Sequence, residues 1–184
     1  NMTATLEYKP QDVDANDVAV KVTLHKLFGG HSGLEINEGR CNANKAMARL
    51  VQDAIANFAA CLAEWKGGNM RNAIPSSAEV VLTLPKENVE AFKEVVAEWR
   101  QTFKDEYDPI EKTLELDVEE VALPSQIVPE EIQDNLVDAL CAVHNGVYRM
   151  IPYNKEIVET SSNLAIVEIG EGKAKFLILI RSSR

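Results

Sequence analysis

Residues 42–68 read NANKAMARLVQDAIANFAACLAEWKGG, and this stretch decides which fold the sequence predicts. Asn42 is a suitable N-cap for a helix, and Gly67-Gly68 is expected to end it. Because residues three or four positions apart share one face of a helix, the apolar spacing predicts one long amphipathic helix. Its apolar face is formed by Met47, Leu50, Val51, Ala54, Phe58, Leu62 and Trp65.

Alternation of apolar and polar residues around this helix predicts strands. In DVAVKVTLHKL, residues 17–27, the side chains at 18, 20, 22 and 24 are apolar, whereas those at 21, 23 and 25 are polar. Glu171-Gly172 joins the last two strands, which is typical of a hairpin. Strands are predicted at residues 4–8, 17–27, 79–84, 113–121, 163–170 and 173–181.

Two further helices follow from the same spacing rule. One is entered through Pro85 and Lys86, and the other begins at Pro129 and is expected to stop at Asn145-Gly146. Their inward residues are Val89, Phe92, Val96, Trp99 and Phe103 in the first, and Ile132, Leu136, Leu140 and Val143 in the second.

The predicted element order is β-β-α-β-α-β-α-β-β. We therefore predict an α/β (α+β) fold: a two-layer sandwich with a mostly antiparallel sheet, helices on one face and ferredoxin-like elements. Its open sheet face is a candidate surface for a partner.

Composition narrows the range of functions. The chain of 184 residues has a formal net charge of −10, which argues against nucleic acid as a partner because phosphate binding needs clustered Lys and Arg. No apolar run approaches a membrane span. The 3 cysteines, without a CxxC spacing, predict free thiols in a reducing compartment, so a cytoplasmic location is expected. The first residue, Asn1, suggests a segment of a longer protein.

A glycine-rich stretch, GGHSG at residues 29–33, is the first candidate site. The 3 histidines lie on separate predicted elements and lack the H-x-D or H-E-x-x-H spacing, so no self-contained metal site is expected. Ser32 directly follows His31, and G-H-S-G has the wrong spacing for the nucleophile turn G-x-S-x-G. Spacing alone favours a plain turn at His31 over a reactive group. A turn is likewise favoured for the second polar stretch, residues 68–80, which holds Arg71 and Asn72.

The two stretches together carry a resemblance. GGHSGLEINEGRCNANKAMARL followed by RNAIPSSAEV resembles the aminoacyl-histidine dipeptidases, within the wider family of dinuclear zinc peptidases and deacylases. HNGVYR at 144–149, VETSSNLAIVEI at 158–169 and the closing FLILIRSSR agree with it in order and spacing.

The resemblance implies that residues 1–184 are a single lid and dimerisation domain, inserted in a larger metallopeptidase whose catalytic domain lies outside this chain. The parent would bind two divalent metal ions, expected to be zinc, and would hydrolyse Xaa-His dipeptides as a homodimer. This chain alone would bind no metal and would be inactive.

Three residues take their expected roles from the same resemblance. His31 matches a lid histidine that helps hold the polarised carbonyl oxygen of the substrate. Asn72 matches a substrate-contacting residue, and Arg181 matches an arginine that pairs with the terminal carboxylate. Arg71 and Arg149 are expected to be turn or surface residues.

Two alternatives stay open at this stage. The chain could be a stand-alone α/β module for dimerisation or small-ligand binding without catalysis. It could also come from a peptidase that has lost its activity.

Overall fold

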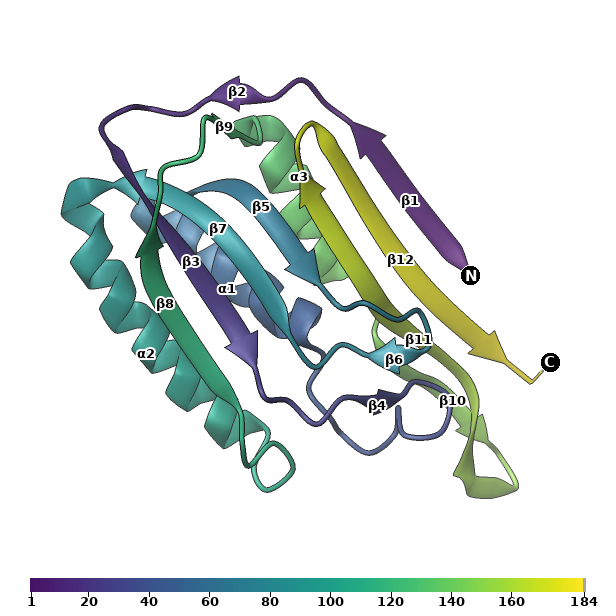
Figure 1. Cartoon of the computed structure of the whole chain (residues 1–184). Helices are drawn as coiled ribbons and strands as arrows, with labels where there is room; N and C mark the ends of the chain where they lie inside the picture. The colour runs from purple at the N-terminus through teal and green to yellow at the C-terminus, as the bar shows by residue number, and fades with distance from the viewer. Residues whose placement is uncertain (184) are drawn as a thin grey trace.

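Three helices cover one face of an eight-stranded sheet in the computed structural model of the chain (Figure 1). The structure describes residues 1–183; residue 184, which ends the FLILIRSSR stretch, lies outside the described residues. The helices are α1 (Ala43–Phe58), α2 (Val89–Glu106, preceded by a 3-10 turn, Lys86–Asn88) and α3 (Glu130–Ala142). The main strands are β1 (Met2–Glu7), β3 (Asp17–His25), β5 (Cys61–Gly67), β7 (Ala78–Pro85), β8 (Glu115–Val121), β10 (Gly146–Ile151), β11 (Asn154–Gly170) and β12 (Lys173–Ser182).

The sheet order is β1-β12-β11-β5-β7-β3-β8, and β10 pairs with β11. Every recorded strand pair is antiparallel. The segment from β3 to β8 runs β-α-β-β-α-β with spatial order β5-β7-β3-β8, which is the ferredoxin-like arrangement. The predicted fold class is confirmed.

The first helix begins where the sequence predicts. The Asn42 side chain accepts hydrogen bonds from the backbone N–H groups of Asn44 and Lys45, at 3.0 and 3.2 Å, so it caps α1. Met47, Leu50 and Val51 are fully buried against the sheet. Burial of this apolar face is the main force that holds α1 in place.

The end of this helix was predicted wrongly. α1 stops at Phe58 rather than at Gly67, because Ala59 adopts a left-handed conformation with φ 53°. Cys61–Gly67 forms strand β5 instead. A bulge between Leu62 and Glu64 shifts the register against β7, so Leu62 and Trp65 lie three residues apart although both are buried in a strand. That spacing is also typical of a helix, and it misled the prediction.

The second half of the chain needs three smaller corrections. β10 was not predicted, and β11 begins at Asn154, well before residue 163. α3 does begin after Pro129, but it ends at Ala142, so Asn145-Gly146 is not its stop. The hairpin turn at Glu171-Gly172 is confirmed, with both residues at positive φ.

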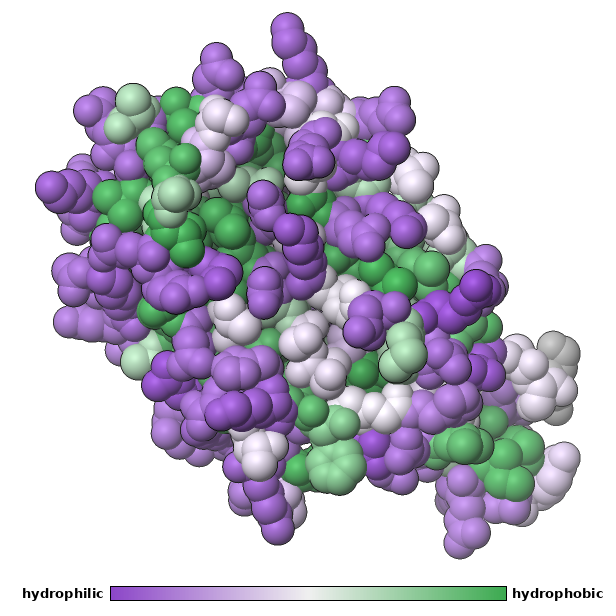
Figure 2. All heavy atoms as spheres, in the orientation of Figure 1, coloured by the Kyte–Doolittle hydropathy of each residue, from purple (hydrophilic) through white to green (hydrophobic). Residues whose placement is uncertain are grey.

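The other face of the sheet carries no helix and is mostly hydrophilic (Figures 1 and 2). Side chains of neighbouring strands bond each other across it: Lys21 forms an ion pair with Glu119 at 2.7 Å, and His25 forms a hydrogen bond with Asp117 at 2.7 Å. None of the helices within residues 1–183 combines the length and apolar composition that a membrane span requires.

Two other short strand pairs lie outside the main sheet: β2 (Gln11–Asp12) with β9 (Gln126–Ile127), and β4 (Gly30–His31) with β6 (Ala73–Ile74). The second pair joins the two polar stretches that the sequence singled out. It lies at the end of the sheet where β12 finishes and β10 begins (Figure 1).

A buried cluster of asparagines fastens this end of the sheet to α1. The Asn42 amide N–H group donates to Asn145 Oδ1 at 2.8 Å, to the Leu164 carbonyl at 3.1 Å and to Asn163 Oδ1 at 3.3 Å. Asn163 in turn donates to the Ala73 carbonyl at 2.7 Å. Asn42 and Asn163 are 3% and 1% exposed, so these bonds are shielded from water.

The rest of the NANK stretch has a structural role as well. Asn44 donates to the Gly67 carbonyl and accepts from the Trp65 indole. The Lys45 ammonium group donates to the carbonyls of Leu140, Cys141 and Val143, each at 2.7 Å. Lys45 therefore caps the C-terminus of α3. Burial lowers the pKa of the Lys45 ammonium group.

We predict that Asn42→Ala lowers the free energy of unfolding by about 2–4 kcal/mol, because it removes the cap of α1 and leaves buried acceptors unpaired. Urea unfolding followed by circular dichroism measures this. Asn57→Ala, on the exposed face of the same helix, is the matched control and should cost less than about 0.5 kcal/mol. A loss below about 1 kcal/mol for Asn42→Ala would contradict the prediction.

Candidate functional site

The loop between β3 and α1 presents His31 next to the second polar stretch. His31 pairs with Ala73 and Gly30 with Ile74 in the short β4–β6 ladder. The backbone N–H and the hydroxyl of Ser32 both donate to the Asn72 carbonyl, at 2.9 and 3.0 Å. Ser32 thus ties the two loops together, and its hydroxyl group is already engaged.

The His31 ring is half-buried and has one nitrogen engaged. Its Nδ1 atom accepts a hydrogen bond from the Gly33 backbone N–H at 3.2 Å. A neutral imidazole that accepts at Nδ1 carries its proton on Nε2. Within residues 1–183 Nε2 has no hydrogen-bond partner, so this N–H can donate to a group from outside the domain.

Arg181, near the end of β12, lies beside the same loop. A Cβ atom added at Gly33 would come within 2.9 Å of Arg181 Nε and 3.0 Å of His31 Cε1. These two atoms are therefore within about 6 Å of each other. The exposed Arg181 guanidinium has no carboxylate partner among the residues that the structure describes. It can receive an anion from outside.

Asn72 lies exposed in the turn just before β6. Its carbonyl is held by Ser32, and the next residue, Ala73, is held by Asn163. Its side-chain amide makes no hydrogen bond within residues 1–183, so both its donor and acceptor groups are available.

The structure thus places the three predicted residues at one end of the sheet. They come from three separate segments: the loop after β3, the turn before β6 and the end of β12. The glycines have separate roles. Gly29 and Gly30 adopt positive φ, at 64° and 122°, whereas Gly33 leaves the space for Arg181.

Sequence reasoning missed the residues that hold this loop. Glu35 Oε2 accepts from the His31 backbone N–H at 2.6 Å, and Glu35 Oε1 accepts from Arg40 at 2.7 Å. The His31 bond, followed by Arg40, holds the pKa of the Glu35 carboxyl below its usual range. A glutamate four residues after the histidine, within a glycine-rich turn, was the available signal.

Arg149 and Arg71, the remaining polar candidates, were expected to be turn or surface residues. Arg149 forms an ion pair with the buried Glu159 at 3.4 Å, from β10 to β11. Arg71 is exposed in the turn before Asn72.

The cysteines and potential metal ligands add no second centre in the described part of the chain. Cys41, Cys61 and Cys141 are free thiols; Cys141 lies on α3 as predicted, and Cys61 lies on β5 rather than on a helix. Burial raises the pKa of Cys41 to about 12, so this thiol stays protonated. Residues 1–183 contain no group of three or more His, Cys, Asp or Glu side chains that could hold a metal ion.

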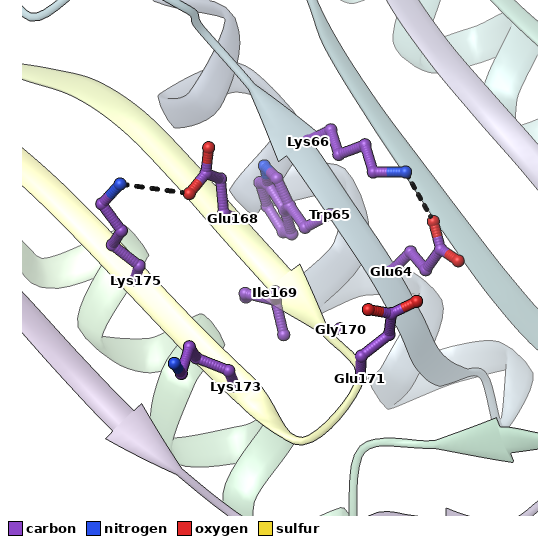
Figure 3. Close-up of a pocket in the computed structure, with 9 residues that line it drawn as sticks. All are labelled: Glu64, Trp65, Lys66, Glu168, Ile169, Gly170, Glu171, Lys173 and Lys175. Atoms are coloured by element: carbon purple, nitrogen blue, oxygen red, sulfur yellow. Dashed lines mark hydrogen bonds and ion pairs between the residues drawn. The ribbon is translucent and has the colours of Figure 1, made fainter.

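A hollow of the open face lies away from His31, over β5, β11 and β12 (Figure 3). Its volume is about 510 Å³. Lys66 pairs with Glu64 at 3.1 Å and Lys175 with Glu168 at 3.3 Å, so its charges are largely neutralised within the chain. Such surface pairs are typical of a solvated sheet face.

Comparison with known proteins identifies the domain. A family model described as a peptidase dimerisation domain matches residues 22–111. The cytosol non-specific dipeptidase of Escherichia coli (strain K12) is 32% identical over 182 residues, which are 99% of this chain and 38% of that protein. The crystal structure of an aminoacylhistidine dipeptidase from Vibrio alginolyticus matches with a TM-score of 0.95 and 36% identity, over 98% of this chain and 37% of that one.

The chain therefore spans less than two fifths of the length of either relative. These matches confirm the family resemblance on which His31, Asn72 and Arg181 were chosen. Residues 22–111 match the family model of a peptidase dimerisation domain, and the chain has the fold of the corresponding part of that aminoacylhistidine dipeptidase.

Proposed function

We propose that residues 1–184 are the lid and dimerisation domain of a metal-dependent dipeptidase that cleaves Xaa-His dipeptides. The observation that carries the proposal is the convergence of His31, Asn72 and Arg181 with their functional groups free to bind a ligand. A histidine, an arginine and an amide lie at the same end of a domain that has no group of three or more potential metal ligands in residues 1–183. Such a site is incomplete on its own, and it requires a second protein surface opposite it that supplies the metal ions.

The chemistry of the three side chains fits a dipeptide. A neutral His31 would donate its Nε2–H to the carbonyl oxygen as negative charge develops there, which lowers the barrier to attack. The planar Arg181 guanidinium would bind the terminal carboxylate through two hydrogen bonds. Asn72 would meet the N–H or carbonyl of the same substrate.

The metal ions would be held by residues outside this chain. Two divalent ions, which we propose to be zinc, would polarise the scissile carbonyl and activate the attacking water. The domain itself would bind and orient the dipeptide and exclude water when it closes. It would carry out these roles without supplying a metal ligand.

The arrangement of the chain ends supports an inserted domain. β1 and β12 are antiparallel neighbours, with Met2 opposite Ile178, so the N-terminus lies near the end of β12 (Figure 1). Adjacent ends let a domain be inserted into another without disturbing it. We further propose that the protein is a homodimer, which the dimerisation-domain match supports, and that it acts in the cytoplasm.

The isolated chain, supplied with zinc or manganese, should not hydrolyse a Xaa-His dipeptide such as carnosine, because its residues 1–183 contain no group of side chains that could hold the metal ions. Release of free histidine measures this. Turnover that co-purifies with the chain and exceeds that of a mock preparation would contradict the proposal.

In the complete protein, His31→Ala should lower kcat by about 10²–10³-fold, the usual effect of removing an oxyanion donor, and leave the metal content unchanged. His25→Ala is the matched control, because His25 bonds Asp117 on the open sheet face. A near-normal kcat for His31→Ala would reduce His31 to a turn residue.

Arg181→Met should raise KM at least about tenfold for dipeptides with a free carboxylate, because a charge-assisted hydrogen bond is lost. The same variant should leave the KM of a C-terminal amide substrate almost unchanged. Lys173→Met, which removes one positive charge from the same strand, is the control. Equal effects on both substrates would argue against carboxylate recognition by Arg181.

A further inference from the structure

Two charged side chains, those of Glu35 and Arg40, hold the backbone around His31. We call the side chains of Glu35 and Arg40 the Glu35–Arg40 bracket. Glu35 accepts the His31 backbone N–H at 2.6 Å, and Arg40 donates from Nη1 to the Gly29 carbonyl at 2.7 Å. A third bond, Arg40 Nη2 to Glu35 Oε1 at 2.7 Å, connects the two. The bracket therefore grips the chain on both sides of Gly30.

The same glutamate also closes a backbone turn with His31. The Glu35 N–H donates to the His31 carbonyl at 2.9 Å, while its carboxylate receives the His31 N–H. Both polar groups of the His31 backbone are thus bonded to one residue. Gly33, whose N–H holds His31 Nδ1, lies inside this turn. The orientation of the ring consequently depends on the turn.

Arg40 is placed for a structural grip rather than for contact with a ligand. Its side chain is only 9% exposed, its guanidinium carbon lies 4.5 Å from the centre of the Phe28 ring, and Nη2 also binds Glu38 at 2.6 Å. The planar guanidinium is suited to several partners at once, which the point charge of a lysine cannot reproduce.

Gly30 shows how closely the bracket packs on the backbone. An added Cβ would clash with Arg40 Nη1 and come within 2.6 Å of Glu35 Oε2. Its φ of 122° also disfavours any side chain. The contacts with Arg40 and Glu35 place the bracket directly against the peptide that precedes His31.

We propose that Glu35 and Arg40 are positioning residues that fix the turn 31–35 and thereby keep His31 as the Nε2–H donor. Without the bracket, the turn would open, Gly33 would release Nδ1, and the two neutral tautomers of His31 would both be populated. The kinetic consequence rests on the proposed function, whereas the tautomer is a property of this chain alone.

The first experiment examines the tautomer of His31 in the chain by ¹⁵N NMR, together with amide hydrogen exchange at Gly33. The starting protein should show a protonated Nε2, an accepting Nδ1 and a protected Gly33 amide. In Arg40→Lys and Glu35→Gln we expect mixed tautomers and Gly33 exchange about tenfold faster or more. Glu35→Gln keeps the shape of the side chain, so this variant still tests the proposal if Arg40→Lys unfolds the loop.

Arg49→Lys is the matched control. Arg49 also makes a two-bond pair with a carboxylate, Glu106, at 2.6 and 2.7 Å, and lies over an aromatic ring, Trp99. This variant should leave the His31 signals and the Gly33 exchange unchanged. An unaltered tautomer and unaltered exchange in both bracket variants would overturn the proposal, as would the same change in Arg49→Lys.

The second experiment is a double-mutant cycle on kcat in the complete protein. Arg40→Lys should lower kcat about tenfold to a hundredfold with KM nearly constant, because His31 is misplaced. It should have no further effect in the His31→Ala background. A normal kcat for His31→Ala would refute the proposed function and leave the tautomer result standing. A fall for His31→Ala without one for Arg40→Lys, or equal effects of Arg40→Lys in both backgrounds, would refute the positioning role.

Discussion

The Asn42 side chain makes the contacts on which the rest of this end of the domain depends. One amide caps α1 through its oxygen and, through its N–H groups, binds segments more than a hundred residues away. Asn163 extends the connection to Ala73, the residue that follows Asn72. Because these groups are buried, each bond that fails leaves a polar atom without water or partner, which makes the arrangement all-or-none.

In this part of the domain, the residues that hold the loops in place are different from the residues that are free to bind a ligand. The side chains of Asn42, Asn163 and Lys45 are engaged in hydrogen bonds within the domain. The side chains of Glu35 and Arg40, in the loop between β3 and α1, are engaged in the same way. His31 Nε2 and the side chains of Asn72 and Arg181 keep their binding capacity. The side chains that would act on a substrate thus sit on the outer side of a rigid polar layer, where position is set before any ligand arrives.

Local signals in the sequence predicted much of the fold, and tertiary contacts explain the rest. The Asn42 cap and the hairpin at Glu171-Gly172 follow from residue chemistry alone, so both were predicted. The end of α1 was missed because the bulge at Leu62 mimics helical spacing. The proximity of His31, Asn72 and Arg181 arises from pairing across the chain, which spacing cannot reveal. Composition singled out the stretches that hold His31 and Asn72, but only the family resemblance pointed to Arg181 and implied a role for each of the three residues. The sequence did not predict the internal bonds of Glu35 and Arg40, because charged residues in a loop usually face solvent.

We propose that His31 completes a catalytic centre located on another domain. The most direct measurement is the crystal structure of the complete protein bound to a phosphinic analogue of a Xaa-His dipeptide, whose tetrahedral oxygens mimic the transition state. We predict His31 Nε2 at about 2.7–3.1 Å from a phosphinic oxygen, with Nδ1 still on Gly33. A closed complex in which solvent separates the imidazole from the analogue in every subunit would contradict the claim.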